Sequence, residues 1–530
     1  MNNRTKFTRR RVISLGALLG GAVVVGPLVS GCSTPTTDSG RSPEAGGATT
    51  SREPSGAKSE VITMGSAVDV LNFDPYAQTT NAIIVLRLLN AWLLTYDEDL
   101  NPQLDTLAGY ELSDDRTTCT LKLRDDVVFT TGKTMTAEDV VFAFERAMNP
   151  ETGFNLASPS QIIESVSSPE PLLVELKFKG PTSQTLVEDL LVGQPVVDKD
   201  HNSAEGLATT PASAGPYRLV SRTAGQSLTL EANPDWYGGE VETQRIELRI
   251  FTDTRALTSG LESGALDLAV YVPPRDGQRL QEKFEYLDSY PGSATMLLRV
   301  SAITPPFDQK SLRQALWHSV NRDRIVEEVL FGFGGAAALP WGPNSPAQDD
   351  SYDDRVQYDL EAAKALLEDV SVAAGAAMVN GSDPISISVM QIIQADLASI
   401  GFDLQIEQVD AATFQDRLVA GDFGVVLGQM GGGQLSLPRI TQNSLFRLSN
   451  NPLWPDGVPP QAYVEAIETL TSEQDEKARQ AAFDQLNDVI VDEAWAIGTY
   501  YVPQLYMFKP ELKGVARDHQ NALVLDKASF

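Results

Sequence analysis

The side chains that could do chemistry in this sequence are few and scattered. No GxSxG nucleophile motif, HExxH zinc motif or phosphate-binding loop occurs in a supporting context. The three histidines, His201, His318 and His519, have no spacing that would assemble a metal site. The carboxylate pairs Asp125-Asp126 and Asp349-Asp350 are adjacent residues, so their side chains point apart or into water. The sequence therefore predicts neither an enzyme nor a bound metal or other cofactor.

The N-terminal residues carry an export pattern that ends at a cysteine. A twin-arginine pattern at residues 8–13 precedes an apolar run, residues 12–29, that several glycines interrupt. Val29-Ser30-Gly31-Cys32 follows and has the form of a bacterial lipobox, in which Cys32 is lipidated. We expect residues 1–32 to direct export and to anchor the protein to the outer face of the cytoplasmic membrane. The alternative is a retained transmembrane anchor with an incidental cysteine.

Residues 33–59 contain no large apolar side chain and are rich in Ser, Thr, Gly and Pro. Such a segment cannot bury enough surface to order itself, so we expect a flexible linker. Beyond it, no apolar run is long enough to cross a bilayer.

The body of the chain is strongly acidic. The 530 residues carry a formal net charge of −30, and residues 1–59 hold eight basic and three acidic side chains, so residues 60–530 carry −35. A body with this charge repels nucleic acids and anionic lipid surfaces, which argues against DNA or RNA as a partner. The acidity identifies no ligand, since it also serves solubility. With 42% hydrophobic residues, the chain can form about three domains.

The clearest local pattern is a strand, a turn and a capped helix within residues 118–148. Cys119, Leu121 and Leu123 alternate with polar residues, which predicts a strand with one buried face and makes Cys119 a small core residue. Gly132 marks the turn. Thr136 is predicted to cap a helix with acidic residues in its first turn.

Other patterns predict a mixture of helices and strands along the whole body. The apolar run at 83–94 predicts a buried helix, and 389–400 a helix that ends at Gly401. Residues 403–409 alternate as a strand, and the aromatic run 495–508 is β-rich.

Several of these blocks resemble the family of bacterial extracellular solute-binding proteins, family 5, that serve peptide, nickel and opine ABC importers. The resemblance is carried, in order, by NFDPY, LRDDVVF–TGK–TAEDVVFAFERA, AGPYRLV…LTLEANPDWYGG and PPFD…RQA…VNRDRI. One block would be weak evidence, but several in register cover nearly all of residues 60–530.

The resemblance implies an α/β fold of mixed α+β sheets, with two lobes as in periplasmic binding proteins and with the extra domain of the large members. It implies a discontinuous domain I in lobe 1, a domain II that is the extra domain of lobe 1, and a domain III that forms lobe 2. The expected boundaries are 60–93, 211–292 and 494–530 for domain I, 94–210 for domain II, and 293–493 for domain III.

Carried over by position, the resemblance also implies ligand-binding residues in four segments. They are Thr79, Thr80 and Asn81 after NFDPY, Arg299 and Ser301 before the third block, Gln429, Met430 and Gly433 in the segment 423–438, and Tyr501 and Tyr506 near the C-terminus. For each of them the alternative is an ordinary surface or core residue.

Two segments depart from the family pattern. Peptide-binding relatives have an Asp in the segment that matches 423–438, where it pairs with the ligand's ammonium, but this segment has no acidic residue. Gly431-Gly432-Gly433 could instead let the backbone approach a ligand, or form a merely flexible loop. Between Leu367 and Val389 the expected strand is shortened, which suggests a trimmed domain III.

We therefore expect a monomeric, lipid-anchored solute-binding protein that captures a short peptide or another small organic solute between two lobes. Its partners would be the permease and ATPase subunits of an ABC importer. The alternative is a lipoprotein of the same fold that acts as a sensor or a partner-binding module, which the two departures motivate.

Overall fold

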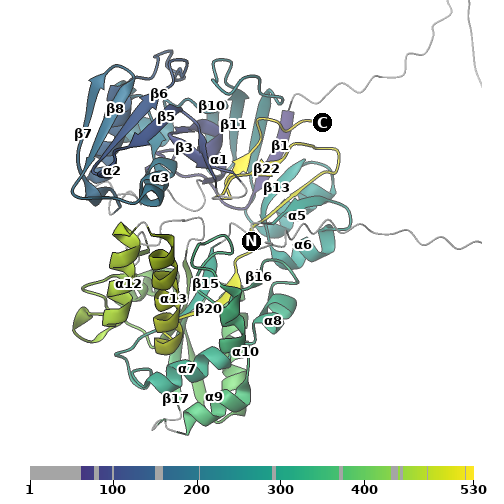
Figure 1. Ribbon diagram of the computed structural model, residues 1–530. Coiled ribbons are helices and arrows are strands. Elements are labelled where there is room, and N and C mark those ends of the chain that lie inside the picture. The colour runs from purple at the N-terminus through teal and green to yellow at the C-terminus, as the bar shows by residue number, and fades with distance from the viewer. Residues whose placement is uncertain are drawn as a thin grey trace, which may run out of the picture. The chain divides into compact units, whose positions relative to one another are not determined.

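Three β-sheets organise the folded part of the chain in the computed structural model (Figure 1). Residues 58–530 form one compact unit. The structure describes residues 61–76, 83–97, 101–149, 159–201, 203–288, 294–368, 370, 374–430, 440–441, 446–473, 475–519 and 521–530.

The largest sheet has seven strands in the order β10-β11-β12-β1-β13-β21-β14. Its apolar residues alternate as a strand requires, and Met64, Ile246 and Leu268 are completely buried. Strand β1 is parallel to both β12 and β13, whereas β21 is antiparallel to β13. The strands span Val61–Ser66 (β1), Tyr217–Thr223 (β10), Ser227–Ala232 (β11), Arg245–Ile250 (β12), Leu268–Val272 (β13), Glu285–Leu287 (β14) and Leu505–Phe508 (β21). The helices α1 (Ile83–Leu89), α5 (Thr254–Glu262) and α6 (Pro274–Leu280) belong to this part of the chain.

A four-stranded sheet, ordered β5-β6-β8-β7, holds the predicted strand, turn and helix. Its members are β5 (Leu107–Leu112), β6 (Thr118–Leu123), β7 (Ile163–Glu170) and β8 (Leu173–Phe178), with α2 (Ala137–Met148), α3 (Gln184–Gly193) and α4 (Ala204–Thr209) in the same stretch of chain. Cys119 is fully buried, as predicted, and burial raises the pKa of its thiol to about 12. Asp139 accepts hydrogen bonds from the backbone N–H and the hydroxyl of Thr136, so Thr136 begins α2 as predicted.

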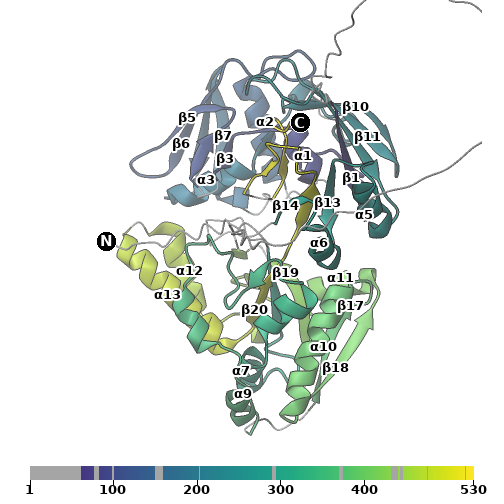
Figure 2. The same cartoon turned by 90° about the vertical axis from the view of Figure 1, so that its right-hand side faces the viewer.

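The third sheet has six strands in the order β16-β20-β15-β19-β17-β18. Figure 2 shows α12 and α13 on one side of β19 and β20, and α10 on the other. The strands span Thr295–Val300 (β15), Gly335–Ala336 (β16), Ala374–Asn380 (β17), Asp403–Val409 (β18), Val425–Met430 (β19) and Ala496–Tyr501 (β20). The helices are α7 (Lys310–His318), α8 (Arg322–Arg324), a π-helical turn (Ile325–Val329), α9 (Leu360–Leu367), α10 (Pro384–Ser399), α11 (Ala411–Ala420), α12 (Gln461–Ser472) and α13 (Glu476–Glu493).

Short strand pairs complete the structure: β2 (Ala91–Trp92) with β9 (Pro195–Val196), β3 (Leu94–Tyr96) with β4 (Pro102–Leu104), and β22 (Ala516–Arg517) with β23 (Leu523–Val524). Among the described residues, no helix has both the length and the apolar character that crossing a membrane requires.

The predicted helix over 83–94 is too long. Helix α1 ends at Leu89, where the Asn90 side chain donates to the carbonyl of Leu86. Beyond it, Ala91 pairs with Val196 as a strand. The apolar run is buried, as predicted, but Ala91–Trp92 and Leu94 belong to strands and not to the helix.

The segment between 367 and 389, where we expected a shortened strand, contains a strand of seven residues. The small residues there form β17, which pairs with β18 and β19 inside the sheet. Small side chains are needed because the ring of Phe307 lies against this strand: a Cβ on Gly375 would lie 2.6 Å from it. The helix α10 begins at Pro384, five residues earlier than predicted.

The C-terminal segment from residue 494, which we expected in domain I, contributes a strand to each of the two large sheets. Strand β20 is hydrogen-bonded to β15 in the six-stranded sheet. Only β21 joins the seven-stranded sheet.

Candidate ligand-binding site

The chain passes between the seven-stranded and six-stranded sheets at two adjacent connections. Strand β14 leads to β15, and β20 leads to β21. The partners are antiparallel in both sheets, and the N–H of Val502 donates to the carbonyl of Ala294 at 2.8 Å between them. One end of the six-stranded sheet, that of Thr295 and Tyr501, therefore lies at the junction of the two lobes.

Strand register brings two of the predicted residues into one row at this end. Met430 on β19 is opposite Thr295 on β15, and Thr295 is opposite Tyr501 on β20. We call Thr295, Met430 and Tyr501 the junction row. All three side chains are buried, whereas Gln429, the neighbour of Met430, is exposed.

Arg299 lies on β15, on the same face as Thr295, and only 6% of it is exposed. Its Nη2 donates to the carbonyl of Gln429 at 2.6 Å. Burial lowers the pKa of its guanidinium to about 10, because a charged group is less stable away from water. Among the described residues, no carboxylate forms an ion pair with Arg299, and its Nε is buried without a hydrogen-bond partner.

A glycine makes room for this side chain. A Cβ on Gly428 would lie 2.4 Å from Arg299 Nε, so the guanidinium extends over the backbone of β19 toward Gln429. Since Gln429 is opposite Met296, the guanidinium ends within one residue of the junction row. The hydroxyl of Thr295 is likewise buried and has no partner among the described residues.

The resemblance did not point to Thr295 or Gly428. A glycine that follows the apolar residues Val425 to Leu427 was a usable signal, since glycine inside a strand often marks a close approach by another group. Thr295 gave no such signal, because threonine is ordinary in strands.

The structure does not bring Ser301 or Tyr506 to the junction row. Ser301 follows the opposite end of β15, where its hydroxyl lies 2.9 Å from Thr304 Oγ1. Tyr506 lies in the seven-stranded sheet, and its hydroxyl donates to the carbonyl of Asn521. Thr79, Thr80, Asn81 and Gly433 lie outside the described residues, and so does Cys32.

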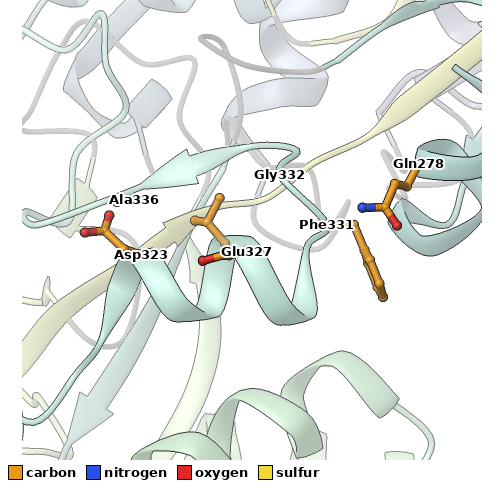
Figure 3. A pocket seen from close by; sticks show the side chains of 7 residues that line it. Gln278, Asp323, Glu327, Phe331, Gly332 and Ala336 are labelled. Carbon is orange, nitrogen blue, oxygen red and sulfur yellow. The ribbon is translucent and has the colours of Figure 1, made fainter. Parts of the chain in front are cut away.

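A separate open hollow of about 290 Å³ lies next to the outer strand of the six-stranded sheet (Figure 3). Asp323 and Glu327 line it from α8 and the π-helical turn, and Gln278 comes from α6. The junction row contributes no residue to it. We base the candidate site on the row, because the Thr295 hydroxyl and Arg299 Nε are buried there or close by and have no partner among the described residues.

Within the described ranges, no three His, Cys, Asp or Glu side chains lie together in a way that would hold a metal ion. His201 lies 2.9 Å from Asp198, in a cluster around Lys133 that is remote from the junction row in sequence and sheet.

Comparison with known proteins identifies the fold and the family. The chain is 23% identical to the nickel-binding periplasmic protein of Escherichia coli K12 over 500 residues, which cover 87% of this chain and 92% of that protein. It is 22% identical to the oligopeptide-binding protein AppA of Bacillus subtilis 168 over 484 residues, 85% of this chain and 87% of that protein. The structure of NikA from Brucella suis, solved in complex with Fe(III)-EDTA, has a TM-score of 0.78 at 20% identity and covers 88% of this chain and 99% of NikA.

The predicted two-lobed α/β fold is thereby confirmed. The family model "Bacterial extracellular solute-binding proteins, family 5 Middle" matches residues 99–452, more than half of the chain. The chain therefore belongs to family 5 of the bacterial extracellular solute-binding proteins, which are components of transport systems and not enzymes.

Proposed function

We propose that this protein is the substrate-binding component of an ABC importer and captures a short peptide or another small organic solute at the junction row. Family membership supports the binding role, and the position of the row beside the two connections between lobes supports the place. A ligand held there contacts the segments that must bend when the lobes move, so binding and lobe closure are coupled.

The names of the relatives do not agree on one class of ligand. Similar proteins are named for nickel and for oligopeptides, and the fold accommodates both. The segment 423–438 has no acidic residue, so it offers no partner to the free ammonium of a peptide. This observation favours a ligand that needs no carboxylate at that position.

We also propose export and anchoring through Cys32, with the body outside the cytoplasm. The lipobox sequence supports this, together with relatives that are periplasmic. For the domains we propose the expected boundaries with one change: domain I resumes after Tyr501, because β20 belongs to the six-stranded sheet of domain III. We expect the permease and ATPase to be the partners of a monomer.

The alternative, a sensor or partner-binding lipoprotein, retains one of its two supports. The strand β17 removes the argument from a trimmed domain III. The lack of an acidic residue in 423–438 remains, and it concerns the ligand more than the transport role.

The test begins with the full chain purified from the membrane fraction of its own host. We expect native mass spectrometry to show a bound small molecule, and Cys32→Ser to move the protein out of the membrane fraction. A strain without the gene should then fail to take up that molecule in isotope-labelled form, and the restored gene should recover uptake. Unchanged uptake in the deletion strain would favour the sensor, and a chain that carries and binds no solute would contradict both binding and transport.

A further inference from the structure

We propose that Arg299 binds a carboxylate of the solute, and that the solute is therefore a small organic anion. This inference rests on the proposed function and adds the class of ligand to it. The supporting observation is that the buried guanidinium of Arg299 has N–H donors without a partner among the described residues. Its end lies close to the junction row, where we propose that the ligand binds.

The other buried arginines of the six-stranded half, Arg313 and Arg322, form more hydrogen bonds than Arg299 does. Arg313 pairs with the carboxylate of Glu493 at 2.8 Å and also donates to backbone carbonyls. Arg322 donates to the carbonyls of Ala337, Gly498 and Val356, each at 3.0 Å. Its Nη2 is buried without a partner, but the nearby carboxylates of Asp353 and Asp323 favour its charged form, and no described carboxylate does so for Arg299. Arg299 is equally buried, yet among the described residues it forms one hydrogen bond and no ion pair. A guanidinium has five N–H donors, so most of its capacity is open.

The open donors lie beside the junction row. Gly428 leaves space for the guanidinium to cross β19, and the Gln429 carbonyl fixes where it ends. The unpartnered hydroxyl of Thr295 lies on the same face, at the adjacent register position. Two buried donors therefore converge on one side of the sheet from separate positions of β15.

Charge identifies what these donors need. Burying a cation without a counter-ion is unfavourable, and a partner that carries one negative charge offsets this cost. The neighbouring segment 423–438 supplies none, because it contains no Asp or Glu. The planar fork of a guanidinium matches the two oxygens of a carboxylate. The same cation repels a ligand that presents an ammonium there.

The test uses the low-molecular-mass fraction of the host's culture medium as the probe. The full chain, emptied by dialysis, is incubated with this fraction or with the same fraction after an anion exchanger has removed its organic anions. We expect native mass spectrometry to show binding from the first and none from the second, with a bound mass that corresponds to a carboxylic acid. For Arg299→Gln we expect affinity for that acid to fall roughly 10- to 150-fold, the range for a hydrogen-bonded charge.

Two controls separate a binding role from a structural one. Arg249→Gln, an exposed arginine in the other lobe, should bind like the wild type. The melting temperature of empty Arg299→Gln should equal or exceed that of the empty wild type, because an unpaired buried charge has been removed. A lowered melting temperature with unchanged affinity, a bound phosphate ester, or binding that survives anion removal would each overturn the proposal while the proposed function stands. Binding from neither fraction would overturn both.

Discussion

At the scale of single residues, the space above Gly428 controls where the Arg299 guanidinium lies. We expect Gly428→Ala to weaken ligand binding by about 10-fold or more, because the new methyl group would occupy the place of Arg299 Nε, 2.4 Å away. The side chain is flexible and can move, so the loss of stability should be small. Isothermal titration and thermal melting on the same sample measure the two effects.

Two other glycines in strands are matched controls. A methyl group on Gly109 would meet nothing within 4 Å, so Gly109→Ala should leave affinity and stability unchanged. On Gly498 it would lie 2.5 Å from the carbonyl oxygen of Leu339, and backbone cannot yield easily, so Gly498→Ala should cost about 1–3 kcal/mol of stability. Equal behaviour of Gly428→Ala and Gly109→Ala would show that Arg299 does not need this space.

Single residues were also where the sequence was least informative. Position in the family pattern led to Met430 and Tyr501, which the register brings to one end of a sheet. It also led to Arg299, whose backbone lies toward the other end but whose side chain reaches the carbonyl of Gln429. The same reasoning selected Ser301. Strand β15 ends at Val300, however, so Ser301 already lies outside the strand. Register and strand ends depend on tertiary pairing, and the pattern of residue types does not contain them.

At the scale of elements, Lys133 ties the start of α2 to the loop before α4. Its Nζ lies 2.6 Å from Asp139 of α2 and 2.9 Å from Asp198 of the loop. Burial alone would raise the pKa of Asp198, but hydrogen bonds from Lys133, the Asp200 N–H, Thr131 and His201 outweigh it and lower this pKa to about 2. The ordinary carboxyl value is 3.8, so the ionised form is favoured by folding.

We therefore expect Asp198→Asn to lower the free energy of unfolding at pH 7 by about 2 kcal/mol. The stabilisation by Asp198 is complete above the pKa that its carboxyl has in the unfolded chain. It is lost as the pH falls through the lower pKa of this carboxyl in the folded protein. The difference between wild type and variant should thus narrow between pH 4 and pH 2. Urea unfolding at pH 7 and pH 3 tests this.

Asp126→Asn is the matched control for that experiment. Its ion pair with Arg124 is solvent-exposed, so stability should change by no more than about 0.5 kcal/mol. A gap between Asp198→Asn and wild type that stays constant with pH would mean that Asp198 stabilises the loop by shape and not by charge.

Elements in which apolar and polar residues alternate regularly were predictable from the sequence. Elements whose residues are all apolar or all small were not. The alternation of Cys119, Leu121 and Leu123 predicted β6, and Thr136 predicted the start of α2. The run 83–94 is apolar throughout, so periodicity could not separate α1 from the strands after it. The small residues of β17 have low strand propensity, and they form a strand through pairing with β18 and β19. At Gly375 a larger side chain would meet the ring of Phe307.

At the scale of the whole molecule, a hydrogen bond of Arg116 joins the four-stranded sheet to the six-stranded half. Arg116, in the turn between β5 and β6, donates from Nη1 to the carbonyl of Ser472 at the end of α12, at 3.0 Å. The end of a helix carries partial negative charge, which suits a guanidinium. We expect Arg116→Asn to weaken ligand affinity about 2- to 10-fold by weakening this contact between lobes.

Asparagine is chosen because Arg116 has a φ of +57°, a conformation that Asn tolerates. Small-angle X-ray scattering of the empty variant should show a larger radius of gyration than the wild type. Arg218→Asn, which breaks an exposed ion pair within one sheet, should change neither quantity. Equal dimensions and equal affinity for Arg116→Asn would show that the contact does not hold the lobes together.

The two-lobed organisation was predictable because several sequence blocks occur in the order of the family. The boundary near residue 494 was not, since Trp495 to Phe508 reads as one aromatic, β-rich run. In the structure this run divides at residues 502–504 between two sheets. Only the hydrogen-bond partners, Thr295 for Tyr501 and Val270 for Tyr506, reveal the division.

This division has a consequence for how the protein is made. Strand β20 lies between β16 and β15, and β21 lies between β13 and β14, so both are interior strands of their sheets. A ribosome must pass Tyr501 before the six-stranded sheet has its full set of strands, and Phe508 before the seven-stranded sheet has its own. Until then the nascent chain presents unfilled strand positions in both lobes, which are sites for unwanted pairing. A protease that cuts before Ala496 would likewise release no intact lobe, because one cut removes an interior strand from each.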